Sequence, residues 1–266
     1  GADSPLAGLR AQRQESVRHA QGSYEALLEP ADAGGVSLRE RHLIALRLAA
    51  LTPHAGLIDW HRGHLRRLGA TDADLAAIEG FPDGGALPGR ETALLRFTNR
   101  LTLEPVAAGP EDIAALKAAG LGPRDIVTVA QLLGYLAYEV RALAGLRLLG
   151  EGATAGGTAA GTPRGPVPGD APRHPFTLEV LGWRPWLETV DEVGATPEQA
   201  ALVTEVAPSP DSRPYYATLA HDVPALRERT LLFNGIMYGP GGLRGQVMSR
   251  SLESVVAYTS LMRLSV

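Results

Sequence analysis

The 266-residue chain contains no cysteine. Disulfide bonds, thiolate nucleophiles, iron–sulfur ligation and cysteine-type zinc sites are therefore excluded for these residues. Any chemistry that they perform must use histidine, aspartate, glutamate or tyrosine side chains, or a cofactor. The sequence indicates no particular cofactor, and we expect none.

Neither sign of charge dominates the chain, because 25 basic residues stand against 29 acidic ones and the two kinds are interspersed. The chain lacks the basic stretches that bind nucleic acid and has no acidic tail. The longest apolar stretch, residues 126–149, is interrupted by Gln131, Glu139 and Arg141, which is typical of a buried helix rather than a membrane span. The first residues do not resemble a signal peptide. We therefore predict a soluble, cytoplasmic protein that binds neither nucleic acid nor a membrane.

The sequence also lacks segments in which apolar and polar residues alternate, so we predict an all-α fold. Ser37 and Glu40 have the spacing of a helix capping box and precede an apolar run that continues to Leu51. Apolar residues recur at helical spacing in other segments, which end at glycine or proline. These segments are residues 54–68, 71–78, 91–103, 111–119 and 125–149, and another helix is expected to begin at Thr196-Pro197.

Composition changes abruptly between Gly150 and Pro175, where Gly, Ala, Thr and Pro dominate. Such a stretch cannot bury enough apolar surface to offset the entropy lost on ordering. We predict that residues 150–175 are a linker. It would join a helical domain, residues 1–149, to a second helical unit, residues 176–266.

The two units resemble each other in layout. Residues 24–30 and 37–53 comprise an aromatic-bearing helix that ends near a proline, a glycine-containing turn and an apolar helix. Residues 233–240 and 249–264 have the same order of features. We interpret this as an internal repeat, whose second copy stops early at Val266.

Several motifs in the first unit resemble the alkylhydroperoxidase-like (AhpD-like) and carboxymuconolactone decarboxylase superfamily. Arg41 opens an apolar helix, His61 lies in the next predicted helix, and Gly69 follows His61 by eight residues, as in that superfamily. Segments of the second unit resemble its peroxidase-related branch, namely residues 176–177, 182–186, 219–222, 226–229 and 234–237. The resemblance implies an AhpD-like helical fold of two related units that forms homo-oligomers.

The resemblance also assigns candidate site residues. Peroxidase members have a glutamate twelve residues before a Cys-x-x-Cys pair, which a histidine follows. Here His42 stands at the glutamate position, His54 and Leu57 stand at the cysteine positions, and the histidine is retained as His61. The first unit therefore lacks the dithiol, as the decarboxylase branch does.

In the second unit, Glu253 stands at the glutamate position. The cysteine positions of this copy would begin at Ser265, one residue before the chain ends. Either the chain is a fragment of a longer protein in which the second copy continues, or the second copy is degenerate. We favour the fragment. The catalytic candidates that the resemblance implies are His61, His42, His54 and Glu253.

His61 has two interpretations, a general acid or base and a structural core histidine. The catalytic interpretation requires a partner that orients the ring, and His42 and Asp59 are the nearest candidates. His54 lies seven residues from His61, on the same face of a continuous helix but too far along it to share a metal ion. His61 and His64 could bind a metal with Asp59 or His42, but no His-Glu-x-x-His signature supports this, and we predict no metal site.

Two classes of function remain open. The first is an enzyme that acts on a small molecule, and we favour it. It would be a peroxidase-related oxidoreductase acting on a hydroperoxide if the protein continues past residue 266. Otherwise it would be a cysteine-free acid–base catalyst, resembling carboxymuconolactone decarboxylase and acting on a lactone or carboxylate. The second class is a non-catalytic scaffold or ligand-binding module.

Overall fold

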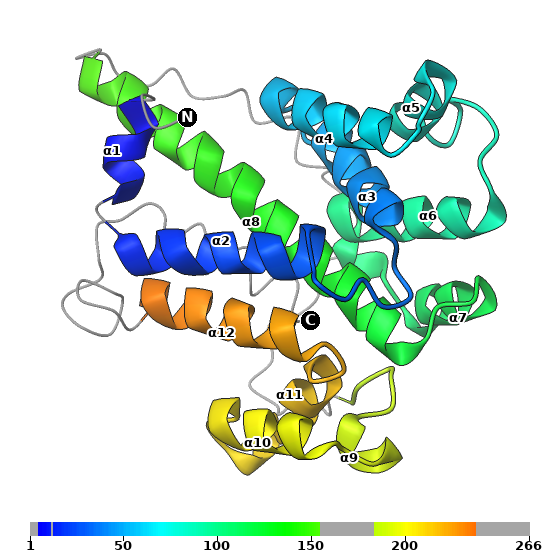
Figure 1. Cartoon of the computed structure of the whole chain (residues 1–266), viewed down its shortest axis with the longest axis vertical. Helices are drawn as coiled ribbons and strands as arrows, with labels where there is room; N and C mark the ends of the chain where they lie inside the picture. Colours follow the sequence, from blue (N-terminus) through cyan, green and yellow to red (C-terminus); the bar gives the residue numbers. More distant parts are fainter. Residues whose placement is uncertain (1–4, 12, 155–183, 238–266) are drawn as a thin grey trace, which may run out of the picture.

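The computed structural model describes residues 5–11, 13–154 and 184–237 (Figure 1). These residues form helices and no strand, which confirms the all-α prediction. Part of the predicted linker, the predicted apolar helix 249–264 and the candidate Glu253 lie outside the described residues. The α-helices are α1 (Pro5–Ala11), α2 (Gln14–Leu28), α3 (Leu38–Leu51), α4 (Ala55–Arg67), α5 (Asp72–Glu79), α6 (Gly89–Leu103), α7 (Pro110–Ala118), α8 (Pro123–Thr154), α9 (Val190–Val193), α10 (Pro197–Val206), α11 (Arg213–Leu219) and α12 (Val223–Met237), and short 3-10 turns cover Pro105–Ala107 and Pro210–Ser212.

Helix α3 lies at the centre of the fold, in contact with α2, α4, α5, α6 and α8. Every residue from Glu40 to Ala49 is buried. A helix that is buried all round needs no polar face, which explains why this segment reads as a dense apolar run. The polar residues that it does contain, including Arg41 and His42, are therefore enclosed by the protein and need partners there.

The loop that leads into α3 is held by the side chain of Arg41. Its guanidinium donates hydrogen bonds to the backbone carbonyls of Leu27 (2.6 Å), Ala33 (2.8 Å) and Val36 (2.9 Å). Burial lowers the pKa of Arg41. Three carbonyl oxygens take the place of water around the buried charge. This anchor fixes the first turn of α3, directly before His42.

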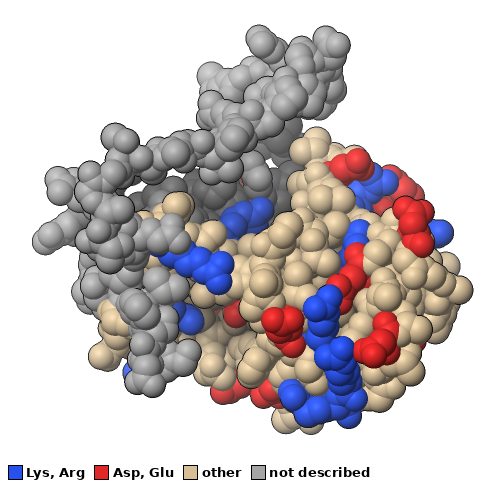
Figure 2. All heavy atoms as spheres, turned by 90° about the horizontal axis from the view of Figure 1, so that it is seen from above, with Lys and Arg blue, Asp and Glu red and all other residues tan. Residues whose placement is uncertain are grey.

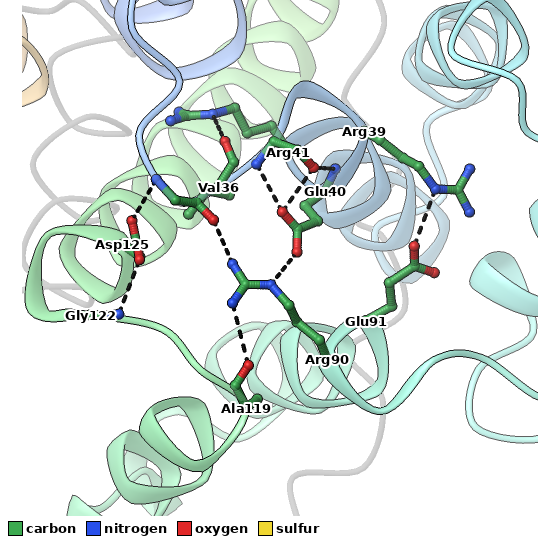
Figure 3. Close-up of polar contacts among 11 residues, drawn as sticks. Val36, Arg39, Glu40, Arg41, Arg90, Glu91, Ala119, Gly122 and Asp125 are labelled. Atoms are coloured by element: carbon green, nitrogen blue, oxygen red, sulfur yellow. Dashed lines mark hydrogen bonds and ion pairs between the residues drawn. The ribbon is translucent and has the colours of Figure 1, made fainter.

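A second polar group lies beside this anchor (Figure 3). Glu40 accepts hydrogen bonds from the backbone N–H and the hydroxyl of Ser37, both at 2.8 Å, so the predicted capping box is present. Arg90 of α6 donates to Glu40 at 2.5 Å and to the carbonyls of Gly35 and Ala119. Burial acts to raise the pKa of Glu40, but the hydrogen bonds from Arg90 and Ser37 lower it. Helices α3 and α6 are thereby joined at the entrance to α3.

Helix α8 is the longest element and crosses the molecule diagonally (Figure 1). By length and apolar composition alone, residues Pro123–Leu148 could span a membrane, but 67% of their most apolar window is buried inside the fold. The helix continues to Thr154, so the predicted start of the linker at Gly150 is wrong by about one turn. Glycine lowers helix stability without ending a helix that has already formed.

The described part of the second region has a small core of its own. Val190, Leu202, Val203 and Leu226 are among its buried residues. Helix α10 begins at a capping box with proline in the first turn, as predicted. This region also contacts α8, because Asp222 accepts a hydrogen bond of 2.5 Å from the hydroxyl of Thr128.

Helices α2 and α12 lie side by side in antiparallel orientation (Figure 1). His19 contacts Glu228 at 3.0 Å, and a side chain at Gly22 would meet the Glu228 carboxylate. Each helix has 15 residues, and they occupy equivalent places in the predicted internal repeat. The repeat itself stays a prediction, because its second apolar helix is not among the described residues.

Acidic and basic side chains lie next to one another on the face that Figure 2 draws. Among the described residues, some ion pairs join different elements of the fold. Arg62 contacts Glu79 through two hydrogen bonds of 2.5 Å each, and Arg124 contacts Asp32 at 2.8 Å. These two pairs connect neighbouring elements of the fold.

Candidate functional site

Two of the candidate histidines meet inside the protein. His42 lies in the first half of α3 and His61 in the middle of α4, and their Nδ1 atoms are 3.1 Å apart. Both rings are almost completely enclosed, with 2% of His42 and 1% of His61 exposed. The packing of α4 against α3 thus produces a direct imidazole–imidazole hydrogen bond.

Burial determines the protonation state of this pair. Desolvation lowers the pKa of His42 to about 4, with smaller effects from His64 and Arg67. Desolvation lowers the pKa of His61 further, to about 3, and His42 and His64 add to the shift. Both rings are therefore neutral at physiological pH.

An outer layer of aromatic side chains lies between the pair and the surface. The ring of His64 stacks on His42 with centroids 4.3 Å apart and planes 19° apart. Trp60 contacts His64 at 4.9 Å, and 53% of Trp60 is exposed. The Nε2 of His64 is buried, and no described residue forms a hydrogen bond with it.

Helix α2 contributes to the same side of the site. The hydroxyl of Tyr24 donates to Glu29 at 3.2 Å. Burial raises the pKa of Tyr24, and a hydrogen bond with Trp60 acts in the opposite direction. Burial and Arg67 lower the pKa of His64, which Glu29 partly offsets. Side chains of α2, α3 and α4 therefore contact one another in succession, from the exposed Glu29 to the buried histidine pair.

His54 does not join this group. It is the N-cap of α4 rather than part of the helix, and its Nδ1 accepts a hydrogen bond of 3.3 Å from the backbone N–H of Leu57. The expectation that His54 shares a helix face with His61 is therefore wrong, because the Thr52-Pro53 turn delays the helix start to Ala55. Its ring therefore caps the N-terminal end of α4.

Asp59 is not the orienting partner of His61. Its side chain is 75% exposed and pairs with Arg62 at 3.5 Å. The partner is His42, the other candidate from the sequence. Within the described ranges, no group of three or more His, Asp or Glu side chains is placed to hold a metal ion. What the pair offers is hydrogen bonding and proton transfer.

A comparison with protein families identifies the part of the chain that carries this site. Residues 18–99 match the carboxymuconolactone decarboxylase family. This carboxymuconolactone decarboxylase-like region extends from α2 into α6 and contains the histidine pair. It confirms the resemblance drawn from the motifs around Arg41 and His61. Searches of curated proteins and of solved structures gave no match to this chain.

The sequence pointed to His42 and His61 but missed two members of the outer layer, Trp60 and Tyr24. It placed His64 beside His61, three residues on along the same helix face, but only as a candidate metal ligand. Trp60 stands beside His61 in the chain but gave no signal of its own. Tyr24 comes from another helix, and only the tertiary structure brings it close.

Proposed function

We propose that the carboxymuconolactone decarboxylase-like region is a cysteine-independent acid–base catalyst, in which the histidine pair of His42 and His61 moves protons on a small molecule. The observation that carries this proposal is the 3.1 Å contact between two buried, neutral imidazoles. A lactone or carboxylate of the kind named by the family is the substrate class that we favour.

The hydrogen bond between the rings fixes their tautomers. A neutral imidazole carries one N–H, so only one of the two Nδ1 atoms can be the donor. The ring that donates through Nδ1–H has a bare Nε2, and the ring that accepts at Nδ1 carries Nε2–H. The histidine pair therefore combines one acceptor nitrogen and one donor nitrogen.

This combination permits proton transfer without a buried charge. The bare Nε2 takes a proton from the substrate, the shared proton crosses from one Nδ1 to the other, and the second ring releases its Nε2 proton to the substrate. The pair ends with the same number of protons and with its tautomers exchanged. A single imidazole with a pKa near 3 is a weak base, so the concerted route avoids forming an imidazolium that the site disfavours.

A substrate would approach the histidine pair from the surface side of the site. His64 and Trp60 cover the pair and are less buried than it is. We infer that a substrate reaches the histidines by displacing these two rings. Tyr24 is protonated at neutral pH, and burial raises its pKa further. Its one hydroxyl proton is donated to Glu29, so it would reach a substrate oxygen only when the substrate replaces Glu29 as the acceptor.

Two measurements test the proposal. Imidazole nitrogen NMR should find opposite tautomers for His42 and His61 and no protonation of either ring down to about pH 5. Carboxymuconolactone and related lactone acids should be tested for decarboxylation and for proton exchange in D2O. His61→Gln or His42→Gln should lower kcat by about a hundredfold or more, the usual contribution of a general acid or base.

His221→Gln is the matched control, because this histidine lies in the second region and bonds to the carbonyl of Glu188. It should change kcat little. Identical tautomers in the two rings, or a rate that falls with an apparent pKa near 6.5, would contradict the proposal.

The non-catalytic alternative also has an observation in its favour, the near-complete burial of both rings. On that interpretation no substrate turns over, and His61→Gln lowers only the melting temperature. Thiol peroxidase chemistry would require cysteines, which these 266 residues do not contain.

A further inference from the structure

A cavity lies between α2, α8, α11 and α12, and none of the site histidines lines it. Its volume is about 70 Å³. The polar side chains in its wall include Ser23 of α2, Gln131 of α8 and Arg229 of α12. Leu27, Leu219 and Leu232 form part of its apolar wall.

Two of the polar groups have no hydrogen-bond partner among the described residues. Gln131 is 7% exposed, and no described residue bonds to its amide oxygen or its amide nitrogen. The same holds for the hydroxyl of Ser23, which is 2% exposed. Buried polar groups in native proteins are nearly always paired. The cavity is therefore built for an occupant that forms hydrogen bonds.

Arg229 adds a positive charge. Its guanidinium donates a hydrogen bond to the hydroxyl of Tyr215 and lies 5.4 Å from the centre of that ring. Across the described residues, no carboxylate forms an ion pair with Arg229. A guanidinium has five N–H donors, and the hydrogen bond to Tyr215 uses one of them.

We propose that this cavity binds a small monocarboxylate. The carboxylate would accept hydrogen bonds from Arg229, from the Gln131 amide and from the Ser23 hydroxyl, while a short apolar chain contacts the leucine side chains. Charge-assisted bonds of this kind favour an anion over a neutral molecule of the same shape. The small volume favours a body of a few carbon atoms.

Calorimetry on the whole chain, with acetate, propionate and butyrate as probes, tests this site. Propionamide and propanol are the neutral counterparts of matched size. We expect propionate to bind at least about tenfold more tightly than propionamide, which corresponds to one charge-assisted hydrogen bond. Ser23→Ala and Gln131→Leu should each weaken propionate binding by about tenfold.

Both substitutions should leave the protein folded, because neither removes a side-chain hydrogen bond found among the described residues. His61→Gln should bind propionate as the unaltered chain does, so this proposal and the one for the histidine pair can fail independently. Equal affinity for propionate and propionamide, or binding that survives both substitutions, would overturn the proposal and indicate a cavity filled by water.

Discussion

Arg41 and His42 are consecutive residues of α3 and are equally buried, with 2% of each exposed. The guanidinium of Arg41 donates hydrogen bonds to three backbone carbonyls, which replace its hydration. His42 instead becomes neutral and bonds to a second neutral ring. The first arrangement uses its donors for structure, whereas the second leaves one nitrogen on each ring for chemistry. The contrast separates a structural polar group from a candidate functional one within a single helix.

Replacing the arginine tests the structural side of this contrast most strongly. Arg41→Met should lower the free energy of unfolding by about 3–5 kcal/mol, because three carbonyls lose their buried donor. Urea unfolding measures the change. Arg41→Lys should recover little of it, since one ammonium cannot match the spread of the guanidinium. A loss below about 1 kcal/mol would mean that the loop has other supports.

Lowering the pH should destabilise the folded protein through the histidine pair. The unfolded rings titrate near pH 6.5 and the folded rings near 4 and 3, so the unfolded chain binds more protons in between and stability falls as pH falls. Each ring should remove roughly 2 kcal/mol between pH 7 and pH 5. Urea unfolding at several pH values measures this slope. The double variant His42→Gln and His61→Gln should flatten it, and an unchanged slope would refute the assigned pKa values.

The ion pair beside Arg41 should have an intermediate effect. Glu40→Gln keeps the shape of the side chain but removes the charge that faces Arg90. We expect a loss of about 1–2 kcal/mol in the free energy of unfolding, because the pair is partly buried and forms several hydrogen bonds. Turnover by the histidine pair should be unaffected once folding is allowed for. A large change in kcat with normal stability would place Glu40 in the functional group instead.

The smallest effect is expected at Asp59. This side chain is exposed, and its partner is Arg62 rather than His61. Asp59→Asn should change the free energy of unfolding by less than about 0.5 kcal/mol and leave the pH slope and turnover unchanged. A shift in the titration of His61, followed by NMR, would restore Asp59 as its partner.

Much of the helical architecture follows from local signals. The Ser37–Glu40 capping box and the Thr196-Pro197 start were readable because a cap depends on residues three apart. The end of α8 was not, because glycines at 150 and 152 weaken a helix without deciding where it stops. The start of α4 was misplaced by one residue, and that residue is His54.

The site was predictable where its residues share a helix or a family motif. His61 and His42 were both proposed, and α3 and α4 bring them into contact. The roles of Tyr24 and Gln131 could not be predicted, because they depend on which helices pack together. In the sequence, Gln131 appears only as a polar interruption of an apolar run. Its unpaired amide becomes visible when α2, α11 and α12 close around it.

Helix α2 contributes side chains to both of the proposed sites. Ser23 lines the cavity proposed to bind a monocarboxylate, and Tyr24, the next residue, belongs to the outer layer of the histidine pair. Consecutive side chains on a helix diverge by about 100°. They nevertheless belong to one turn of the same helix. An occupant of the cavity and a substrate of the histidine pair would therefore contact the same segment of α2.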